Sequence, residues 1–402
     1  MKRIYEAVIL EHIKRERQML FIMGPRQVGK TTTTQKVGLV WKKYHYYNWD
    51  RDTDRKLIRR GVTPLANQLQ LTASTKPTPL LIFDELHKYR PWKLFLKGLY
   101  DSYPHQAHIL ATGSAKLNVY RRGGDSLMGR YFSFRFHPLS IAEIVDPSLP
   151  KGVIRKKPKP ISAHAFEKLI KFGGYPDPFI NGTVRYYNRW KKLRLEKLFR
   201  EDIRDLTRVQ ELDQLQLMAR LLQAQIGQNT SYDSLAKKVR VSSNTIRNWF
   251  GILKDLYYCF EVRPWSKNIT RSLLKEPKYY LWDWSLCADL GALAENFVAS
   301  HLLKAVHFWT DYGFGDYELY YLRDKDQREV DFLIVKDQQP WILVEVKNST
   351  QGLSPALGYF QQMTGAPHAF QLSFTAPFVA KNCFEIRRPT IVPASTFLSQ
   401  LI

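Results

Sequence analysis

An eight-residue run near the amino end has the spacing of a phosphate-binding loop. It contains, in order, Gly24, Pro25, Arg26, Gln27, Val28, Gly29, Lys30 and Thr31. Glycine, four residues, then Gly-Lys-Thr is the Walker A pattern, in which glycines let backbone N–H groups wrap around phosphates. There, Lys30 contacts the β and γ phosphate oxygens and the Thr31 hydroxyl reaches Mg²⁺. We therefore expect this loop to bind ATP and Mg²⁺, and we include the adjacent Thr32 in the nucleotide-binding set.

Two carboxylates follow the apolar run at residues 80–83. Asp84 and Glu85 come directly after it, which is the arrangement of a Walker B motif. Asp84 is expected to hold the Mg²⁺ shell, and Glu85 to polarise the attacking water as a general base. Another apolar run, 108–111, is followed by Thr112 and, two residues later, Ser114. Either hydroxyl could sense the γ-phosphate, and the alternative role for both is to cap a turn.

A second set of reactive residue types lies near the carboxyl end. Asp331 falls in the apolar run 330–336, and Glu345 and Lys347 fall in the next run, 341–347. Because side chains alternate along a strand, Glu345 and Lys347 point to the same face. Asp331 and Glu345 could bind a second Mg²⁺ or Mn²⁺ while Lys347 orients the attacking water. In the alternative, the fold serves as a substrate-binding platform and these three side chains are residual or solvated.

The apolar runs indicate how these residues are positioned. Short continuous runs at 19–23, 80–83 and 108–111, separated by helical patterns, predict a parallel sheet covered on both faces. Residues 1–150 are therefore predicted to form an α/β P-loop domain. A basic segment with prolines, 151–160, has the composition of a linker.

Residues 151–284 are predicted to be mainly helical, with a winged-helix-like element. A short helix (234–239), a turn (240–243) and a longer helix (244–258) follow a helix-turn-helix rhythm, and 260–284 alternates like a strand pair that could be a wing. Residues 285–402 return to a strand-rich pattern and are predicted to form a separate α/β domain.

Charge points to a polyanionic partner. The 61 Lys and Arg residues against 37 Asp and Glu give a net charge of +24, which attracts nucleic acid. In the helix-turn-helix, Arg247, Asn248 and Lys254 are available to contact DNA. The basic helix around Lys191 and Lys192 is a rival surface. Winged-helix modules also bind proteins, so a protein partner is the alternative to DNA.

The composition also bears on location. Three widely spaced cysteines form neither a disulfide framework nor a Cys-x-x-Cys site, which predicts a reduced, cytoplasmic protein. No apolar stretch approaches the roughly 18 residues of a membrane span, so no membrane association is expected.

Several motifs in family order resemble the prokaryotic AAA-type ATPases that carry a C-terminal domain of unknown function. Besides the phosphate loop, the motifs are Asn48-Trp49-Asp50, 83–88 (Phe-Asp-Glu-Leu-His-Lys), 112–115 (Thr-Gly-Ser-Ala), 127–131 (Leu-Met-Gly-Arg-Tyr), 138–140 (Pro-Leu-Ser), 173–176 (Gly-Gly-Tyr-Pro) and 200–203 (Arg-Glu-Asp-Ile). The resemblance implies that Arg130 is an arginine finger for a neighbouring subunit, and hence a homo-oligomer, where such a residue can be worth about 10³ to 10⁵ in rate. A surface salt bridge is the alternative for Arg130.

The C-terminal carboxylates and lysine resemble the restriction-endonuclease-like, or PD-(D/E)xK, core. This resemblance implies that Glu295 is the additional acid that many such cores carry on their first helix. The leading hypothesis is an ATPase whose nucleotide state is coupled to a DNA-binding C-terminal half. The alternatives are an ATP-gated, metal-dependent DNA nuclease and a nucleotide-dependent switch that binds a protein.

Overall fold

The chain divides into two compact units, Met1–His137 and Pro138–Ile402. The computed structural model describes residues 1–71, 77–113, 127–203, 209, 211–266, 276–348 and 352–402, without the side chains of residues 201 and 202. The predicted division into residues 1–150, 151–284 and 285–402 stays a prediction.

The N-terminal unit is built on a five-stranded sheet in the order β2-β3-β4-β1-β5. Every neighbouring pair in it is parallel. The strands are β1 (Met19–Met23), β2 (Tyr44–Asn48), β3 (Leu80–Asp84), β4 (His108–Gly113) and β5 (Tyr131–Arg135). β1 and β3 are buried along their whole length, as expected for parallel strands covered on both faces. The predicted α/β fold with a parallel sheet is confirmed.

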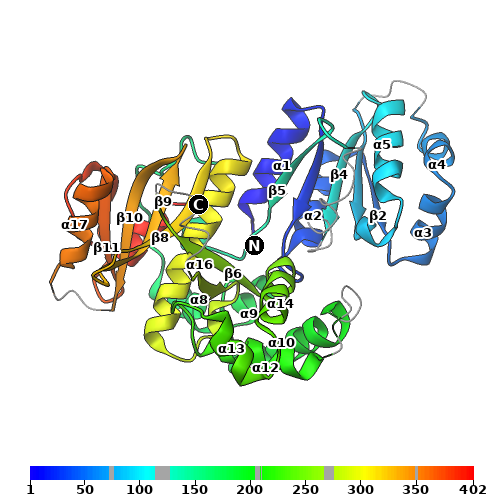
Figure 1. The fold of residues 1–402 in the computed structure, drawn as a ribbon. Helices are drawn as coiled ribbons and strands as arrows, with labels where there is room; N and C mark the ends of the chain where they lie inside the picture. Colours follow the sequence, from blue (N-terminus) through cyan, green and yellow to red (C-terminus); the bar gives the residue numbers. More distant parts are fainter. Residues whose placement is uncertain (72–76, 114–126, 204–208, 210, 267–275, 349–351) are drawn as a thin grey trace. The chain divides into compact units, whose positions relative to one another are not determined.

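Helices supply the cover for this sheet. They are α1 (Ile4–Arg15), α2 (Lys30–Trp41), α3 (Asp52–Arg59), α4 (Val62–Gln68), η1 (Leu86–Lys88) and α5 (Trp92–Ser102). α1 packs on α2, which contacts β2 and β3. Side chains from α3, α4 and α5 join one apolar cluster with Phe21, Leu81 and Phe83 of the strands, and Figure 1 shows these helices together. Because all strands are parallel, the residues after β1, β3 and β4 lie along one edge of the sheet.

The C-terminal unit begins with helices. They are α7 (Ile141–Val145), α8 (Ala163–Phe172), α9 (Pro176–Asn181), α10 (Val184–Lys197), the π-helical η3 (Leu198–Asp202), α12 (Leu212–Gln223), α13 (Tyr232–Val239) and α14 (Ser243–Asp255). Six α-helices described in this unit start after a Ser, Thr or Asp side chain that accepts a backbone N–H bond, namely at Ser140, Ser162, Thr183, Ser231, Ser242 and Asp289. α13 and α14 confirm the predicted order of a short helix, a turn and a longer helix, with Arg240 in the left-handed region between them.

A mixed seven-stranded sheet follows, in the order β12-β11-β10-β9-β8-β6-β7. Its strands are β6 (Cys259–Pro264), β7 (Lys278–Leu281), β8 (Tyr317–Arg323), β9 (Glu329–Lys336), β10 (Gln339–Lys347), β11 (His368–Ser373) and β12 (Thr390–Pro393). The long helix α16 (Leu290–Asp311) contacts β7 to β10, and α17 (Pro355–Thr364) packs on β9 to β11 (Figure 1). The remaining elements are η4 (Trp284–Leu286), η5 (Cys383–Glu385) and α18 (Ala394–Ser399). The predicted C-terminal α/β fold is confirmed.

The strand pair that the sequence predicted as a wing belongs to this sheet instead. β6 pairs with β7 and also, in parallel, with β8 through Arg263 and Tyr320. Every residue of β7 is buried, so the strand needs cover on both faces, which the exposed wing of a helix-turn-helix does not provide.

The predicted linker is also anchored within the unit. The Arg155 backbone N–H donates to the Gln400 carbonyl oxygen at 2.9 Å, and the Gln400 side chain donates back to the Arg155 carbonyl oxygen at 2.9 Å. Among the residues described, no helix is long and apolar enough to cross a membrane.

Candidate functional site

The phosphate loop connects β1 to α2 through two residues in the left-handed region. Gln27 has φ 61° and Gly29, the N-cap of α2, has φ 99°. Gly24 passes close to the backbone after β5, because a Cβ there would lie 2.3 Å from the Phe136 carbonyl oxygen. The loop thus has the turns and the close backbone approach that the glycines of the motif were predicted to allow.

Lys30 is buried at the start of α2. Its Nζ donates to the carbonyl oxygens of Gly24 at 2.8 Å and Pro25 at 2.7 Å. Burial lowers the pKa of Lys30 to about 8, and the charges of Glu85 and Asp84 oppose this shift. The lysine therefore has a pKa close to neutral pH and lies within the loop itself.

The Asp84 carboxylate, at the end of β3, accepts hydrogen bonds from three hydroxyl groups. Its Oδ2 accepts hydrogen bonds from Thr31 Oγ1 and from the Tyr46 hydroxyl, both at 2.7 Å, and its Oδ1 accepts one from Thr112 Oγ1. The structure therefore brings together three residues that were predicted separately: Thr31, Asp84 and Thr112.

Tyr46 was missed in the sequence analysis. β2 lies beside β3 with Asn48 opposite Asp84, and this register places Tyr46 next to the carboxylate. Burial and the Asp84 charge raise the pKa of its hydroxyl. Local sequence carries no signal for this contact, because it depends on the order of strands in the sheet.

Glu85 follows Asp84 in an unusual backbone conformation. Its φ of 55° lies in the left-handed region, which a non-glycine residue seldom adopts. Glu85 Oε2 is buried, and no described residue donates a hydrogen bond to it. His87 Nε2 lies 3.5 Å from this oxygen, and the Lys88 ammonium nitrogen Nζ lies 3.6 Å from it. The carboxylate thus has an unused acceptor atom.

The other predicted loop residues differ in exposure. Pro25 and Val28 are buried, Arg26 is half-buried, and Gln27 and Thr32 are exposed. Ser114 lies outside the described residues. The roles assigned to these residues stay predictions.

Arg130 forms a bidentate ion pair with Asp101, the last but one residue of α5. The Nε and Nη2 atoms lie 2.8 and 3.0 Å from the two carboxylate oxygens. β5 runs parallel to β1 with Tyr131 opposite Met19, so Arg130 lies at the start of β5. The phosphate loop follows the other end of β1, about 13 Å away at the usual rise per residue. Arg130 therefore cannot serve the nucleotide site of its own chain without a large rearrangement.

The C-terminal residues predicted for catalysis do lie together. Lys347 Nζ is 2.8 Å from Glu345 Oε1, and Asp331 Oδ2 accepts the Val346 backbone N–H at 2.8 Å. Burial raises the pKa of Asp331 well above its usual value, and the charges of Glu295 and Glu345 raise it further. Burial also raises the pKa of Glu295.

A buried lysine that sequence reasoning missed joins this cluster. Lys278 Nζ lies 2.5 Å from Glu329 Oε1 and 3.5 Å from Glu295 Oε1, which also accepts the Tyr280 hydroxyl at 2.7 Å. Burial lowers the pKa of Lys278, but the charges of Glu295, Asp331 and Glu329 raise it above the usual value overall. An ammonium group thus supplies positive charge among these acids.

Within the part of the chain that the structure describes, no group of three or more His, Cys, Asp or Glu side chains could hold a metal ion. A second Mg²⁺ or Mn²⁺ at Asp331 and Glu345 therefore stays a prediction.

Three family models match the chain in succession. Residues 16–145 match the AAA domain, residues 163–296 match a domain of unknown function (DUF8612), and residues 290–376 match another domain of unknown function (DUF4143). The first covers the phosphate loop, Asp84, Glu85 and Arg130, and the last contains the strands with Asp331 and Glu345.

Similar proteins carry little functional information. The uncharacterized protein MJ1544 of Methanocaldococcus jannaschii is 25% identical over 340 residues, which are 80% of this chain and 73% of that protein. The uncharacterized protein Rv2008c of Mycobacterium tuberculosis is 22% identical over 354 residues, which are 84% of this chain and 72% of that protein.

Among solved structures, the Aeropyrum pernix Orc1 protein in complex with DNA is similar with a TM-score of 0.34 and 13% identity, over 73% of this chain and 91% of that one. AMPPCP-bound DnaA from Aquifex aeolicus is similar with a TM-score of 0.32 and 12% identity, over 62% of this chain and 86% of that one. The family models thus identify a region similar to the AAA domain, followed by regions similar to the DUF8612 and DUF4143 domains of unknown function.

Proposed function

We propose that the N-terminal unit binds and hydrolyses ATP with Mg²⁺, and that its nucleotide state is coupled to DNA binding by the basic C-terminal unit. The observation that carries the ATPase part is the convergence of Thr31 and Thr112 on Asp84, at the sheet edge where the phosphate loop begins. Asp84 and Thr112 lie at the ends of β3 and β4, and Thr31 lies at the start of α2, after the loop that follows β1; the parallel sheet brings these positions to one edge.

The residues fit Mg²⁺-ATP. Lys30 and the loop N–H groups would hold the phosphates, and Thr31 and Asp84 would hold the Mg²⁺. When bound, ATP supplies the γ-phosphoryl group that is transferred to water. Glu85 would orient that water and accept its proton at Oε2, the atom that receives no hydrogen bond from any described residue. Thr112 would report on the γ-phosphate through Asp84.

Arg130 is assigned to a neighbouring subunit's site, since it lies too far from the loop of its own chain. Its guanidinium forms an ion pair with Asp101 at the surface, which is the contact expected under the alternative of a surface salt bridge. ATP turnover would then need a homo-oligomer, in which Arg130 of one subunit completes the site of the next.

DNA binding is supported by charge. The C-terminal unit has 36 Lys and Arg residues against 27 Asp and Glu, a net charge of +9, and α10 and α14 carry the exposed basic residues Arg185, Arg189, Lys192 and Arg247. Lys254 has an ion pair with Glu261 at 2.8 Å, so it is less available for DNA than Arg247. If the ligand is a protein instead, the nucleotide-dependent switch is the better description.

The central experiment measures ATP turnover and ATP binding in Glu85→Gln. We expect turnover to fall by about 10² to 10⁴ while Mg²⁺-ATP still binds, because the general base is lost and the phosphate contacts remain. Glu16→Gln makes the same change at an exposed position after α1 and should keep full turnover. Unchanged turnover in Glu85→Gln would reject Glu85 as the base.

The DNA part is tested by titrating salt during binding. If the protein neutralises DNA phosphates, the logarithm of the affinity falls linearly with the logarithm of salt concentration. A flat response, or no binding of single-stranded, double-stranded or branched DNA, would favour the protein partner.

A metal-dependent nuclease is the second candidate, because the sheet gathers Asp331, Glu345 and Lys347 beside Glu295 on α16. This function predicts DNA cleavage with Mn²⁺ or Mg²⁺ that Lys347→Ala abolishes. Cleavage that survives this substitution would show that the cluster is not the catalyst.

A further inference from the structure

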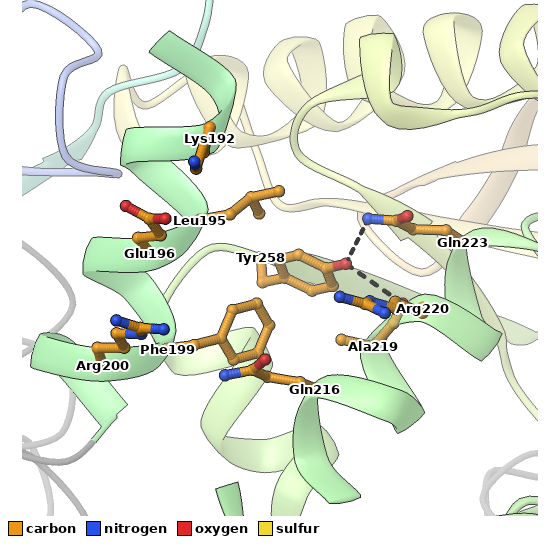
Figure 2. Close-up of a pocket in the computed structure, with 10 residues that line it drawn as sticks. All are labelled: Lys192, Leu195, Glu196, Phe199, Arg200, Gln216, Ala219, Arg220, Gln223 and Tyr258. Atoms are coloured by element: carbon orange, nitrogen blue, oxygen red, sulfur yellow. Dashed lines mark hydrogen bonds between the residues drawn. The ribbon is translucent and has the colours of Figure 1, made fainter. Parts of the chain in front are cut away.

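A cavity of about 370 Å³ lies in the C-terminal unit between α10, η3 and α12 (Figure 2). This volume is in the range of small-molecule sites. Tyr258, which follows α14, lies between the two helices in Figure 2. The cavity belongs neither to the phosphate loop nor to the carboxylate cluster of the C-terminal sheet.

Two facing helical stripes form the walls. α10 and η3 contribute Lys192, Leu195, Glu196 and Phe199, which are spaced as one face of a helix. The opposite face of α10 is fixed in the unit: Arg194 pairs with the buried Asp283 at 3.0 Å. The orientation of the first stripe toward the cavity is therefore set by a buried contact.

α12 provides the second stripe with the same spacing: Gln216, Ala219, Arg220 and Gln223. The neighbouring residues Leu215, Met218 and Leu222 are buried in the core and hold the helix in place. The π-helical turn η3 then adds Arg200 to the lining. π-helical turns are rare and often occur at functional sites.

The lining is positively charged. It contains three cations, Lys192, Arg200 and Arg220, and one carboxylate, Glu196. All three cations are exposed, and none has an ion pair with any residue that the structure describes. The three cations outnumber the one carboxylate, so the lining has a net positive charge, which favours an anionic ligand.

The inner wall is aromatic with amide groups beside it. The rings of Phe199 and Tyr258 meet edge to face, with centroids 5.8 Å apart. The Tyr258 hydroxyl is used internally, since it accepts from Gln223 Nε2 at 2.8 Å and donates to the Ala219 carbonyl oxygen at 3.2 Å (Figure 2). Gln216 has no hydrogen bond to another described residue through its side chain, so both its donor and its acceptor are available.

We propose that this cavity binds one nucleotide, with the phosphate at Lys192, Arg200 and Arg220 and the base against the wall of Phe199 and Tyr258. Anion, apolar ring and hydrogen-bonding edge are the three features of a nucleotide, and the lining offers a partner for each. This proposal rests on the proposed DNA binding, because the nucleotide is taken to be part of a single strand of DNA.

Exposed basic side chains outside the cavity favour a nucleic-acid strand over an acidic peptide as the ligand. Arg185 and Arg189 lie on the same helix, α10, and would contact further phosphates. The same chemistry would also accept a free mononucleotide.

The test measures binding of dTMP and of fluorescein-labelled oligo(dT) to the full chain, with the phosphate loop saturated by Mg²⁺-ADP. Two variants address the cavity by different routes. Leu195→Trp fills it without changing charge, and Arg220→Gln removes one cation. Arg388→Gln is the matched control, because it removes the same charge from an exposed residue outside the lining. Thermal unfolding curves establish that each variant is folded.

We expect Leu195→Trp and Arg220→Gln to weaken the binding of both probes by about 5- to 100-fold, the range for losing one stacked base. Arg220→Gln should also lower the salt slope for oligo(dT) by about 0.7. Arg388→Gln should leave the binding of dTMP and of oligo(dT) unchanged.

Two results would overturn the proposal. One is oligo(dT) binding by the wild type that folded Leu195→Trp keeps, which would leave DNA binding standing and reject the cavity. The other is that neither dTMP nor oligo(dT) binds, while a phosphopeptide binds and Leu195→Trp abolishes that binding. Binding of dTMP that depends on the cavity, without oligo(dT) binding, would support the cavity with a free nucleotide as its ligand and reject the proposed DNA binding.

Discussion

The buried ammonium group of Lys30 makes ATP affinity depend on pH in a calculable way. Burial lowers the pKa of Lys30 to about 8, and bound phosphates would hold the proton on the lysine. Raising the pH above 8 therefore removes the charge from the free loop, and binding must then take up a proton. The factor by which affinity is reduced is about 1.3 at pH 7.5 and about 11 at pH 9. The expected loss between these values is about eightfold, or about 1.2 kcal/mol.

The assay is a titration with a fluorescent ATP analogue and Mg²⁺ at constant ionic strength from pH 7.5 to 9. Over this range the phosphates have already lost their last proton, because its pKa is about 6. Lys30→Arg keeps a positive charge that does not titrate, so any affinity it retains should not change with pH. Wild-type affinity that stays constant, or an equal slope in Lys30→Arg, would refute the placement of the phosphates at Lys30.

Three further outcomes are expected. Mixing Arg130→Ala with Lys30→Met should restore ATP turnover that neither variant has alone, because one subunit keeps the loop and the other keeps the arginine; no recovery at any concentration would contradict action between subunits. Gly24→Ala should abolish ATP binding and lower the unfolding free energy by about 1 to 3 kcal/mol, because its Cβ would lie 2.3 Å from a backbone oxygen. The control is Gly152→Ala, where a Cβ meets no atom within 4 Å, and it should behave as wild type in ATP binding and in thermal unfolding. Burial lowers the pKa of His301 to about 3, so the unfolded chain takes up a proton there more readily than the folded chain. The free energy of unfolding therefore decreases as the pH falls below about 6.5, by about 2 kcal/mol at pH 5. Urea unfolding at pH 7.5 and 5 should show a smaller loss in His301→Gln, and an equal loss would exclude His301 as the source.

The sequence by itself determined the features that are local in the chain. The phosphate loop is one contiguous run, and Asp84 and Glu85 directly follow their strand, so spacing was enough to predict them. The parallel sheet also followed from local patterns, because strands buried on both faces show continuous apolar runs. The AAA domain match supports the predicted class of this domain, and the roles of the individual residues stay predictions.

Only the tertiary structure decided which elements are neighbours. Tyr46 donates a hydrogen bond to Asp84 because β2 lies next to β3, and Arg130 forms an ion pair with Asp101 near the end of α5. Lys278 enters the carboxylate cluster because β7 joins the C-terminal sheet through β6 rather than forming a wing. Apolar periodicity reports that an element is buried, but it carries no information about its partner, since many pairings would bury the same surface. The cavity between α10 and α12 has the same origin: each stripe is visible in the sequence, and only packing sets them face to face.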